Sequence, residues 1–185
     1  MKFISTSLLV ICFFLFQSSI FSQENGNAPA FSDIYLFNEK TDAELPDAWE
    51  FNPAYPGESS IKEENEERFL LLETISEKHA GILLKKSLTR DAPIYRLVII
   101  ARGGGLIEFG FSLWTDKKWI MSKLSKRLPL HSDWNEYEVT LEIPESILSQ
   151  DRNEEQFVQK LIPSIYVHRG YAEIKSLTIE GYYNP

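Results

Sequence analysis

Polar and apolar positions alternate most regularly near the middle of the chain. Bulky apolar side chains occupy every second position there, namely Ile107, Phe109, Phe111 and Leu113. The positions between them are Glu108, Gly110, Ser112 and Trp114. A period of two is typical of a strand that buries one face. The pattern therefore predicts a strand over residues 107–114, with the first set buried and the second set on the opposite face.

The residues on either side predict two neighbouring strands. Residues 94–101 are rich in Val and Ile and are followed by the glycine run 103–105, which we interpret as a turn. After a polar turn at 115–118, the chain returns as a strand over 119–124.

Pairing across the polar turn predicts which residues of this hairpin face each other. It places Trp119 opposite Trp114 and Ile120 opposite Leu113. The two indoles then share one face of the hairpin, and we expect both to face solvent.

The rest of the chain reads as further short strands separated by turn residues. We expect strands over 31–37, 49–52, 69–74, 82–88, 137–143, 164–168 and 173–180. An acidic edge or loop is expected over 61–67, a single helical turn over 144–148, and a turn at Arg169–Gly170. Short strands at close spacing, without a sustained helical period, predict an all-β fold, an antiparallel β-sandwich.

The first residues have the layout of a secretory signal peptide. Lys2 is followed by an apolar run over 8–16, too short to span a bilayer, and then by a Ser/Gln segment. We therefore predict a signal peptide over 1–22, a polar lead-in over 23–30 and one domain over 31–185. The product would be exported, to the periplasm, the cell surface or the medium, without membrane insertion.

Charge and cysteine content narrow the classes of partner. The formal net charge is −8, which disfavours nucleic acid and anionic lipid as ligands. The single cysteine, Cys12, lies in the predicted signal peptide, so the mature domain is expected to rely on packing and not on disulfides.

Four segments together resemble a known family. LPDAWEF, IYRLVIIARG, DWNEYEVTLEIP and IYVHRGYAEIKSLTIEGYY are similar to the galactose-binding-like jelly rolls, and most of all to the carbohydrate-binding modules of secreted polysaccharide-degrading enzymes. The resemblance covers about residues 31–183 and implies a jelly roll that binds a polysaccharide or oligosaccharide. Such modules often hold a structural calcium, for which Asp33 and Asp42 are candidate ligands. The spacing of a dedicated calcium loop is absent, so we expect no cofactor and no metal site.

The tryptophans supply the candidate ligand-binding residues. We expect Trp49 and Trp134 in the core. Trp114 and Trp119 would stack on the apolar face of a sugar ring. Three polar residues expected on the same face would bind its hydroxyls, namely Glu108, Ser112 and Lys123. In the alternative interpretation both rings pack under a loop or cover the second sheet.

A cluster of basic residues raises the question of whether the ligand is acidic. Its members are Arg102, Lys117, Lys118, Lys126 and Arg127. They are either solvated loop charges or contacts for the uronate or sulfate groups of an acidic polysaccharide.

Catalysis is not expected. Ser112 lacks a nucleophile elbow, and the three histidines, His79, His131 and His168, show no paired ligand spacing. Glu136, Glu138 and Glu142 share one strand face, which we interpret as solvated. The alternative to sugar binding is a structural or interaction domain that contacts a protein partner through an exposed sheet face.

Overall fold

The computed structural model describes residues 28–38, 44–75, 78–88, 92–115, 117–143, 158 and 160–183. Within these residues every regular element is a β-strand, and all pairing between strands is antiparallel. The strands are β1 (Phe31–Leu36), β2 (Trp49–Phe51), β3 (Gly57–Glu64), β4 (Glu67–Thr74), β5 (His79–Leu84), β6 (Ile94–Trp114), β7 (Trp119–Leu124), β8 (Leu128–Pro129), β9 (Asn135–Glu142) and β10 (Lys160–Tyr182). The predicted signal peptide, Asp42 and the predicted helical turn over 144–148 lie outside the described residues.

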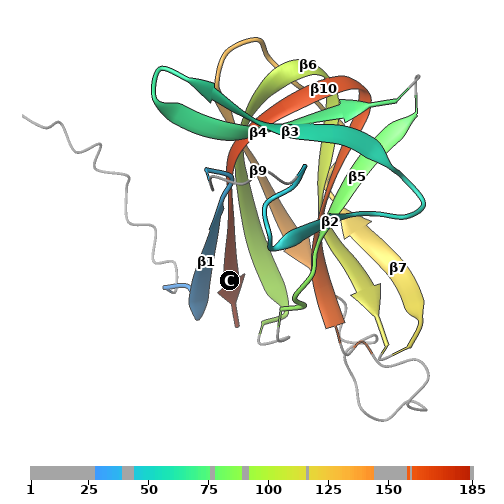
Figure 1. Cartoon of the computed structure of the whole chain (residues 1–185). Helices are drawn as coiled ribbons and strands as arrows, with labels where there is room; N and C mark the ends of the chain where they lie inside the picture. Colours follow the sequence, from blue (N-terminus) through green and yellow to red (C-terminus); the bar gives the residue numbers. More distant parts are fainter. Residues whose placement is uncertain are drawn as a thin grey trace, which may run out of the picture.

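Two long strands organise the molecule. β6 and β10 pair along almost their full lengths, from Ile94 opposite Tyr182 to Trp114 opposite Lys160. Both strands bend over at the same end of the molecule (Figure 1). The ladder between them skips residues after His168, so the bend coincides with an irregularity in pairing.

The bend corrects two sequence expectations. The glycine run 103–105 and Arg169–Gly170 were expected to be turns between separate strands, but each lies inside one continuous strand. Gly103, Gly105 and Gly170 have φ values of 152°, 141° and 123°, which glycine adopts readily. These residues redirect the backbone while the two strands stay paired, so the segments expected as four strands form two.

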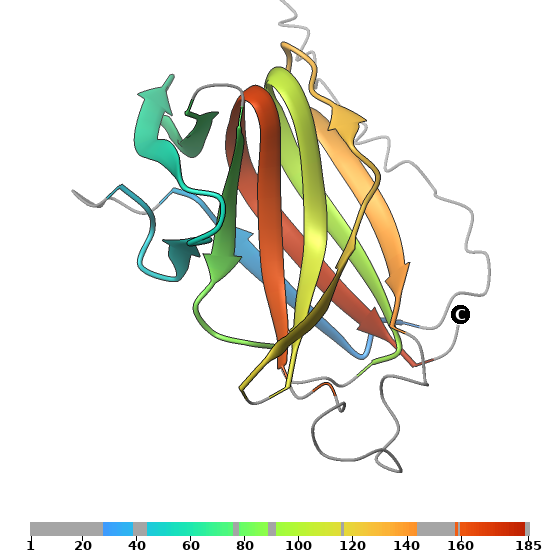
Figure 2. The same ribbon diagram turned by 90° about the vertical axis from the view of Figure 1, so that its right-hand side faces the viewer.

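The bent strands contribute to both layers of the sandwich. One layer has the order β2, β5, first half of β10, second half of β6, β7. The other has the order β1, second half of β10, first half of β6, β9. Figure 2 shows the long strands running from one end of the molecule to the other. β4 pairs with β10 at the bend, and β3 pairs with β4.

The core lies between the layers and follows the predicted alternation. Ile107, Phe109, Phe111 and Leu113 have no exposed surface. Across from them the first half of β6 and the second half of β10 contribute Tyr95, Leu97, Ile99, Leu177 and Ile179. The all-β sandwich prediction is therefore confirmed, and burial of these side chains is its main stabilising term.

The two tryptophans expected in the core, Trp49 and Trp134, differ in burial. Trp49 is buried beside Phe37, with ring centroids 5.2 Å apart, as predicted. Trp134 is only half-buried, so that prediction is wrong. Its ring lies near the bend against Phe69, and the guanidinium of Arg102 lies over it at 4.6 Å from the centroid. Cation–π contact replaces burial at this position.

Three smaller expectations can also be compared with the structure. Glu136, Glu138 and Glu142 share the exposed face of β9, as predicted. The acidic segment over 61–67 is divided between β3 and β4, and positive φ values at Asn65 and Glu66 make the turn. The strand expected over 82–88 spans His79–Leu84 because it pairs with β10 from His168 to Ser164.

Candidate binding groove

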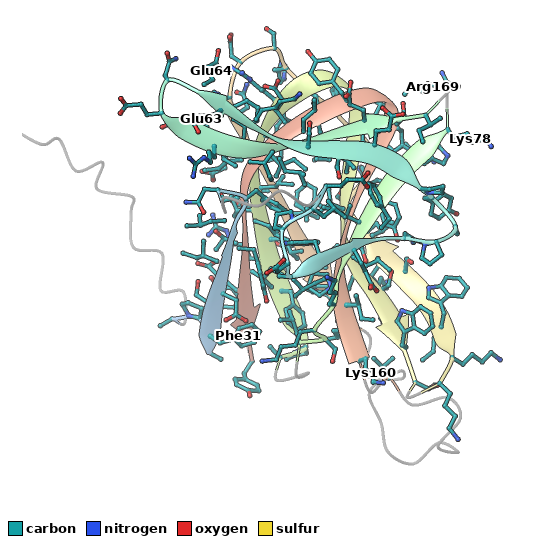
Figure 3. The ribbon with its side chains drawn as sticks, viewed as in Figure 1. Phe31, Glu63, Glu64, Lys78, Lys160 and Arg169 are labelled. Atoms are coloured by element: carbon teal, nitrogen blue, oxygen red, sulfur yellow. The ribbon has the colours of Figure 1, made fainter. Side chains whose placement is uncertain are left out.

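The outer face of the first layer is hollowed into a groove of about 680 Å³. The side chains on this face of β6 are those that alternate with its core residues. The groove is lined by Glu50, Asn52, Pro53, Ala54, Tyr55, Leu83, Ser112, Trp114, Thr115, Trp119, Ser122, Lys160, Ile162 and Tyr166. Lys160 lies at the end of β10 opposite the bend (Figure 3). Because the lining is mostly apolar with a few polar side chains, it suits an amphipathic ligand.

One wall of the groove is the loop that follows β2. The side-chain amide of Asn52 donates a hydrogen bond to the Tyr166 hydroxyl at 3.1 Å, and its carbonyl oxygen accepts one from Ala54 N at 2.9 Å. The backbone of Gly81 accepts from Asn52 N at 2.7 Å and donates to Tyr55 O at 2.8 Å. These bonds hold the wall against β5 and β10, so its shape is set before any ligand arrives.

The opposite wall is formed by the two predicted tryptophans. Trp114 and Trp119 are cross-strand partners, as the sequence predicts. Trp119 is 50% exposed, whereas Trp114 is half-buried and its Nε1 is buried without a hydrogen-bond partner among the described residues. The expectation that both rings face solvent together is therefore correct only for Trp119.

A tight turn holds the two tryptophans side by side. Thr115 N donates to Lys118 O at 2.8 Å, and the Thr115 hydroxyl accepts from Lys118 N at 2.9 Å. Thr115 is nearly buried, so these bonds are shielded from water. Threonine stabilises this turn through its side chain, in the manner of an ST turn.

An irregularity in the hairpin corrects the predicted register. Leu113 pairs with Met121 and not with Ile120, because the ladder shifts between Leu113 and Trp114. The extra residue reverses which side chains of β7 reach the groove. Lys123 therefore pairs with the core residue Phe111, and its expected position on the groove face is wrong. Ser122, which pairs with Ser112, occupies that face instead.

Ser112 lies on the groove floor with its hydroxyl already engaged. The residue is 3% exposed, and its Oγ lies 3.0 Å from the Oγ of Ser164. The Ser164 hydroxyl in turn donates to Ile162 O at 3.0 Å. Ser112 therefore donates to Ser164 and supports the floor, and because it is almost completely covered it is poorly placed to bind a ligand.

A second hollow of about 260 Å³ continues the groove toward the bend. It shares Tyr55, Ser122 and Tyr166 with the first hollow. Its other lining residues are His79, Glu108, Leu124, Arg127 and His168. Of the predicted residues, the first hollow thus contains Ser112, Trp114 and Trp119, and the second contains Glu108.

Glu108 lies between a buried histidine and an exposed arginine. Its Oε2 is 2.5 Å from His168 Nε2 and 3.7 Å from Arg127 Nε. The Arg127 side chain is 55% exposed, so its contribution as an ion pair is small. The carboxylate and the guanidinium offer hydrogen-bond acceptors and donors to the same hollow.

No pattern in the sequence indicates that two histidines meet. His79 and His168 are cross-strand partners on β5 and β10, and their Nδ1 atoms lie 2.5 Å apart. Burial lowers the pKa of His168 below its usual value, an effect that the nearby Glu108 carboxylate partly opposes. The groove residues Asn52, Tyr55 and Tyr166 were missed as well. Only the position of Tyr166, between Ile165 and Val167, could have indicated the groove face.

The predicted basic cluster does not come together. Arg102 lies at the bend, where it forms ion pairs with Glu64 at 2.6 Å and with Glu173. Lys117 and Lys118 lie in the β6–β7 turn, and Arg127 lines the second hollow. Arg102 is therefore a structural residue.

Among the described residues no group of three or more His, Cys, Asp or Glu side chains could hold a metal ion. Asp33 is exposed on β1, and its candidate partner Asp42 is not described. Within the described ranges no helix is long and apolar enough to cross a membrane.

Comparison with known proteins supports the fold. The enzymatically active domain of tailspike protein 4 of bacteriophage CBA120 is similar at a TM-score of 0.53 and 9% identity, over 73% of this chain and 20% of that chain. A Clostridium thermocellum endo-1,4-beta-D-xylanase 10B structure, comprising CBM22-1 and GH10 modules complexed with xylohexaose, is similar at a TM-score of 0.52 and 14% identity, over 75% and 27%. A family 29 carbohydrate binding module matches at a TM-score of 0.48 and 7% identity, over 81% and 89%.

The first two likenesses define a class of fold. The chain is an antiparallel β-sandwich of the jelly-roll type, and a structure that contains a CBM22-1 module is among those it resembles in fold. It spans only a small part of the length of the first two matching chains. No protein-family model matches the sequence, and no curated protein matches it.

Proposed function

We propose that this chain is an exported, non-catalytic carbohydrate-binding domain that holds a polysaccharide or oligosaccharide in the groove between Trp119 and the Tyr55 loop. The observation that supports it best is the exposed Trp119 indole on the wall of a mostly apolar groove. A pyranose ring has apolar C–H faces and polar edges, so it requires a groove of this mixed character. The fold likeness to a structure that contains a CBM22-1 module agrees with the proposal.

The stacking surface consists mainly of Trp119. The Trp119 indole is 50% exposed at the rim, whereas the Trp114 ring is mostly covered by the wall of the groove. Stacking on Trp119 removes apolar surface of both partners from water. Trp114 supports Trp119 from the neighbouring strand.

Polar groups along the groove would bind the sugar hydroxyls. Ser122 and Glu50 line the first hollow, and Glu108 and Arg127 line the second. The carboxylate of Glu108 accepts and the guanidinium of Arg127 donates, which suits two neighbouring hydroxyls of one ring. Because the groove is open, we expect dissociation constants on the order of 10–1000 μM.

The shape of this face favours a glycan over a protein partner. A protein interface would need a flat, largely apolar patch of several hundred Å². The outer face of the first layer is instead concave, and polar side chains occur along its length. An extended chain fits such a surface better than a globular partner does.

Affinity electrophoresis tests the proposal. Gels would contain neutral polysaccharides (xylan, glucomannan, mixed-linkage β-glucan) or acidic ones (alginate, polygalacturonate). We expect at least one to retard the wild type, Trp119→Ala to migrate without retardation, and no release of reducing sugar. Tyr183→Ala is the matched control, because Tyr183 is 62% exposed and does not line the groove. A wild type that no polysaccharide retards, or a Trp119→Ala protein retarded as strongly as wild type, contradicts the proposal.

A further inference from the structure

The second hollow contains a series of side chains in close polar contact that sugar stacking does not require. Three strands each supply one member: Glu108 from β6, His168 from β10 and His79 from β5. His168 is 5% exposed and contacts both of the others, Glu108 through Nε2 and His79 through Nδ1.

The distances determine where the protons lie. A carboxylate can only accept, and a lone pair on His168 Nε2 would repel Glu108 Oε2 at 2.5 Å, so Nε2 carries a hydrogen although this buried nitrogen makes no hydrogen bond of regular geometry. A neutral His168 then has a lone pair at Nδ1, and His79 must donate its Nδ1 hydrogen to it. The two facing nitrogens therefore share one proton, and the series runs in one direction, from His79 through His168 to Glu108.

The series also reaches the wall of the main groove. The rings of His79 and Tyr55 are in edge contact, with centroids 5.9 Å apart, and Tyr55 is in edge contact with Tyr166 at 5.7 Å. Tyr55 and Tyr166 line both hollows. A displacement of His79 would therefore move a side chain that borders the entire groove.

We propose that the Glu108–His168–His79 series positions Glu108 and Tyr55 for glycan binding and releases them when both imidazoles are protonated, so that glycan binding weakens on acidification. This inference rests on the proposed function. The three residues are positioning and ligand-orienting groups, and His168 acts only through its neighbours.

Only protonation of both rings breaks the contact. A proton on His79 Nε2 points away from His168 and leaves the contact intact. A second proton, on His168 Nδ1, sets two N–H groups against each other, so the rings must separate. Because His168 is enclosed by neighbouring strands and His79 is half-exposed, His79 is the ring that moves.

The charged groups around His168 also influence its protonation. Arg127 lies across the hollow, 3.7 Å from Glu108, and opposes protonation of His168, whereas Glu108 favours it. Tyr55 and Tyr166 contribute their phenol side chains to the same hollow. The sequence neighbours Lys78 and Arg169 are exposed, at the end of the molecule away from Lys160 (Figure 3).

Nitrogen-15 NMR of the imidazoles tests the series without any sugar. Near neutral pH we expect His168 to carry its hydrogen on Nε2 and His79 to carry one on Nδ1. A His168 ring protonated on Nδ1 at neutral pH would show that the series is wrong. This result does not depend on whether the protein binds a glycan.

Calorimetry with xylohexaose, cellohexaose and mannohexaose tests the coupling. For each hexaose that binds, we expect affinity to fall roughly tenfold or more between about pH 8 and about pH 5. His79→Gln keeps a donor that does not titrate, and His79→Leu removes it. We expect the first to bind somewhat more weakly than wild type with little dependence on pH, and the second to bind roughly tenfold more weakly at every pH.

A matched histidine outside the groove controls for general effects of pH. His131 is exposed beside Tyr137, so His131→Gln is expected to keep the affinity and pH profile of wild type. A pH-independent wild type, or a His79→Gln protein with the full pH response, overturns the inference while the proposed function stands. If no hexaose binds the wild type, the inference falls together with the proposed binding.

Discussion

Trp114 and Trp119 are cross-strand partners, yet their indoles have different surroundings. Trp119 is half exposed at the rim of the groove, while the Nε1 of Trp114 is sealed from solvent and has no partner among the described residues. A buried, unpaired N–H costs free energy, so packing of the ring must compensate for it. The two rings therefore have different roles: Trp119 exposes apolar surface to a ligand, and Trp114 packs into the wall of the groove.

This difference in burial predicts that the two substitutions affect stability to different extents. Trp119→Ala should change the free energy of unfolding by less than about 1 kcal/mol, because half of the ring is already in water. Trp114→Ala should lower it by about 2–4 kcal/mol, because the ring leaves a cavity in the hairpin. Urea unfolding followed by circular dichroism measures both. Equal losses of stability would mean that the two rings have the same structural role.

The hydrogen bond between Asn52 and Tyr166 makes the loop after β2 testable. Tyr166→Phe removes the hydroxyl that accepts from the Asn52 amide, so the loop should open more often. We expect faster hydrogen exchange over residues 52–55 and a sugar affinity about threefold to tenfold lower. Tyr171→Phe is the control, since Tyr171 is exposed and does not line the groove. Unchanged exchange in Tyr166→Phe would show that this bond does not hold the wall.

The bend in β6 and β10 depends more on the glycine at position 170 than on Gly104, which faces it from β6. At Gly170 φ is 123°, and an added Cβ would overlap the carbonyl oxygen of Gly104. Gly170→Ala should therefore lower the free energy of unfolding by at least about 2 kcal/mol. Gly104→Ala should change it by less than about 1 kcal/mol, since a Cβ there would meet the Tyr171 ring at an ordinary 3.4 Å. Thermal and urea unfolding compare the two, and similar stabilities would contradict the geometry.

The buried histidine predicts how stability depends on pH. The pKa of His168 is lowered in the fold, so the unfolded chain binds a proton at a higher pH than the folded protein does. Stability should therefore be greatest above the unfolded value of about 6.5 and fall as the pH drops from there to the folded pKa. His168→Gln should flatten this part of the curve, as measured by melting temperature against pH. An unchanged slope would assign the effect to another group.

Carboxylates change the stability of the fold at lower pH than His168 does, so the two contributions can be measured separately. The Arg96 guanidinium donates a hydrogen bond to Glu138 and lowers the pKa of that carboxyl. The stability it contributes is present above the unfolded pKa of a glutamate, about 4.3, and is lost as the pH falls further. We expect Glu138→Gln to change the melting curve only in this more acidic range. A change near neutral pH would contradict the assignment.

The alternation of side chains was enough to predict most strands and the buried face of β6. The same local signals misidentified the bend. Glycine with positive φ occurs both in turns and in bent strands, and the residues around Gly103 and Gly170 look alike in either case. Whether the chain reverses at a glycine or continues as a bent strand depends on the strand it pairs with. Here β6 and β10 bend at the same place and remain paired on both sides of the bend.

The candidate groove could be predicted only in part for a related reason. The pairing of Trp114 with Trp119 follows from the turn, but one extra residue at Ile120 moved Lys123 off the predicted face. Tyr55 comes from a loop whose position no pattern indicates. His79 and His168 are 89 residues apart in the chain, and only the pairing of β5 with β10 brings their rings together.

The sequence by itself determined the strand class of this chain, the core face of the second half of β6 and the hairpin that carries two indoles. These features depend on which way successive side chains point, and that is encoded locally. Only the tertiary structure decided the bend shared by β6 and β10, the register of β7, and the groove with its histidine pair. Each of these results from pairing between distant strands, where a single inserted residue reverses which side chains reach the ligand face.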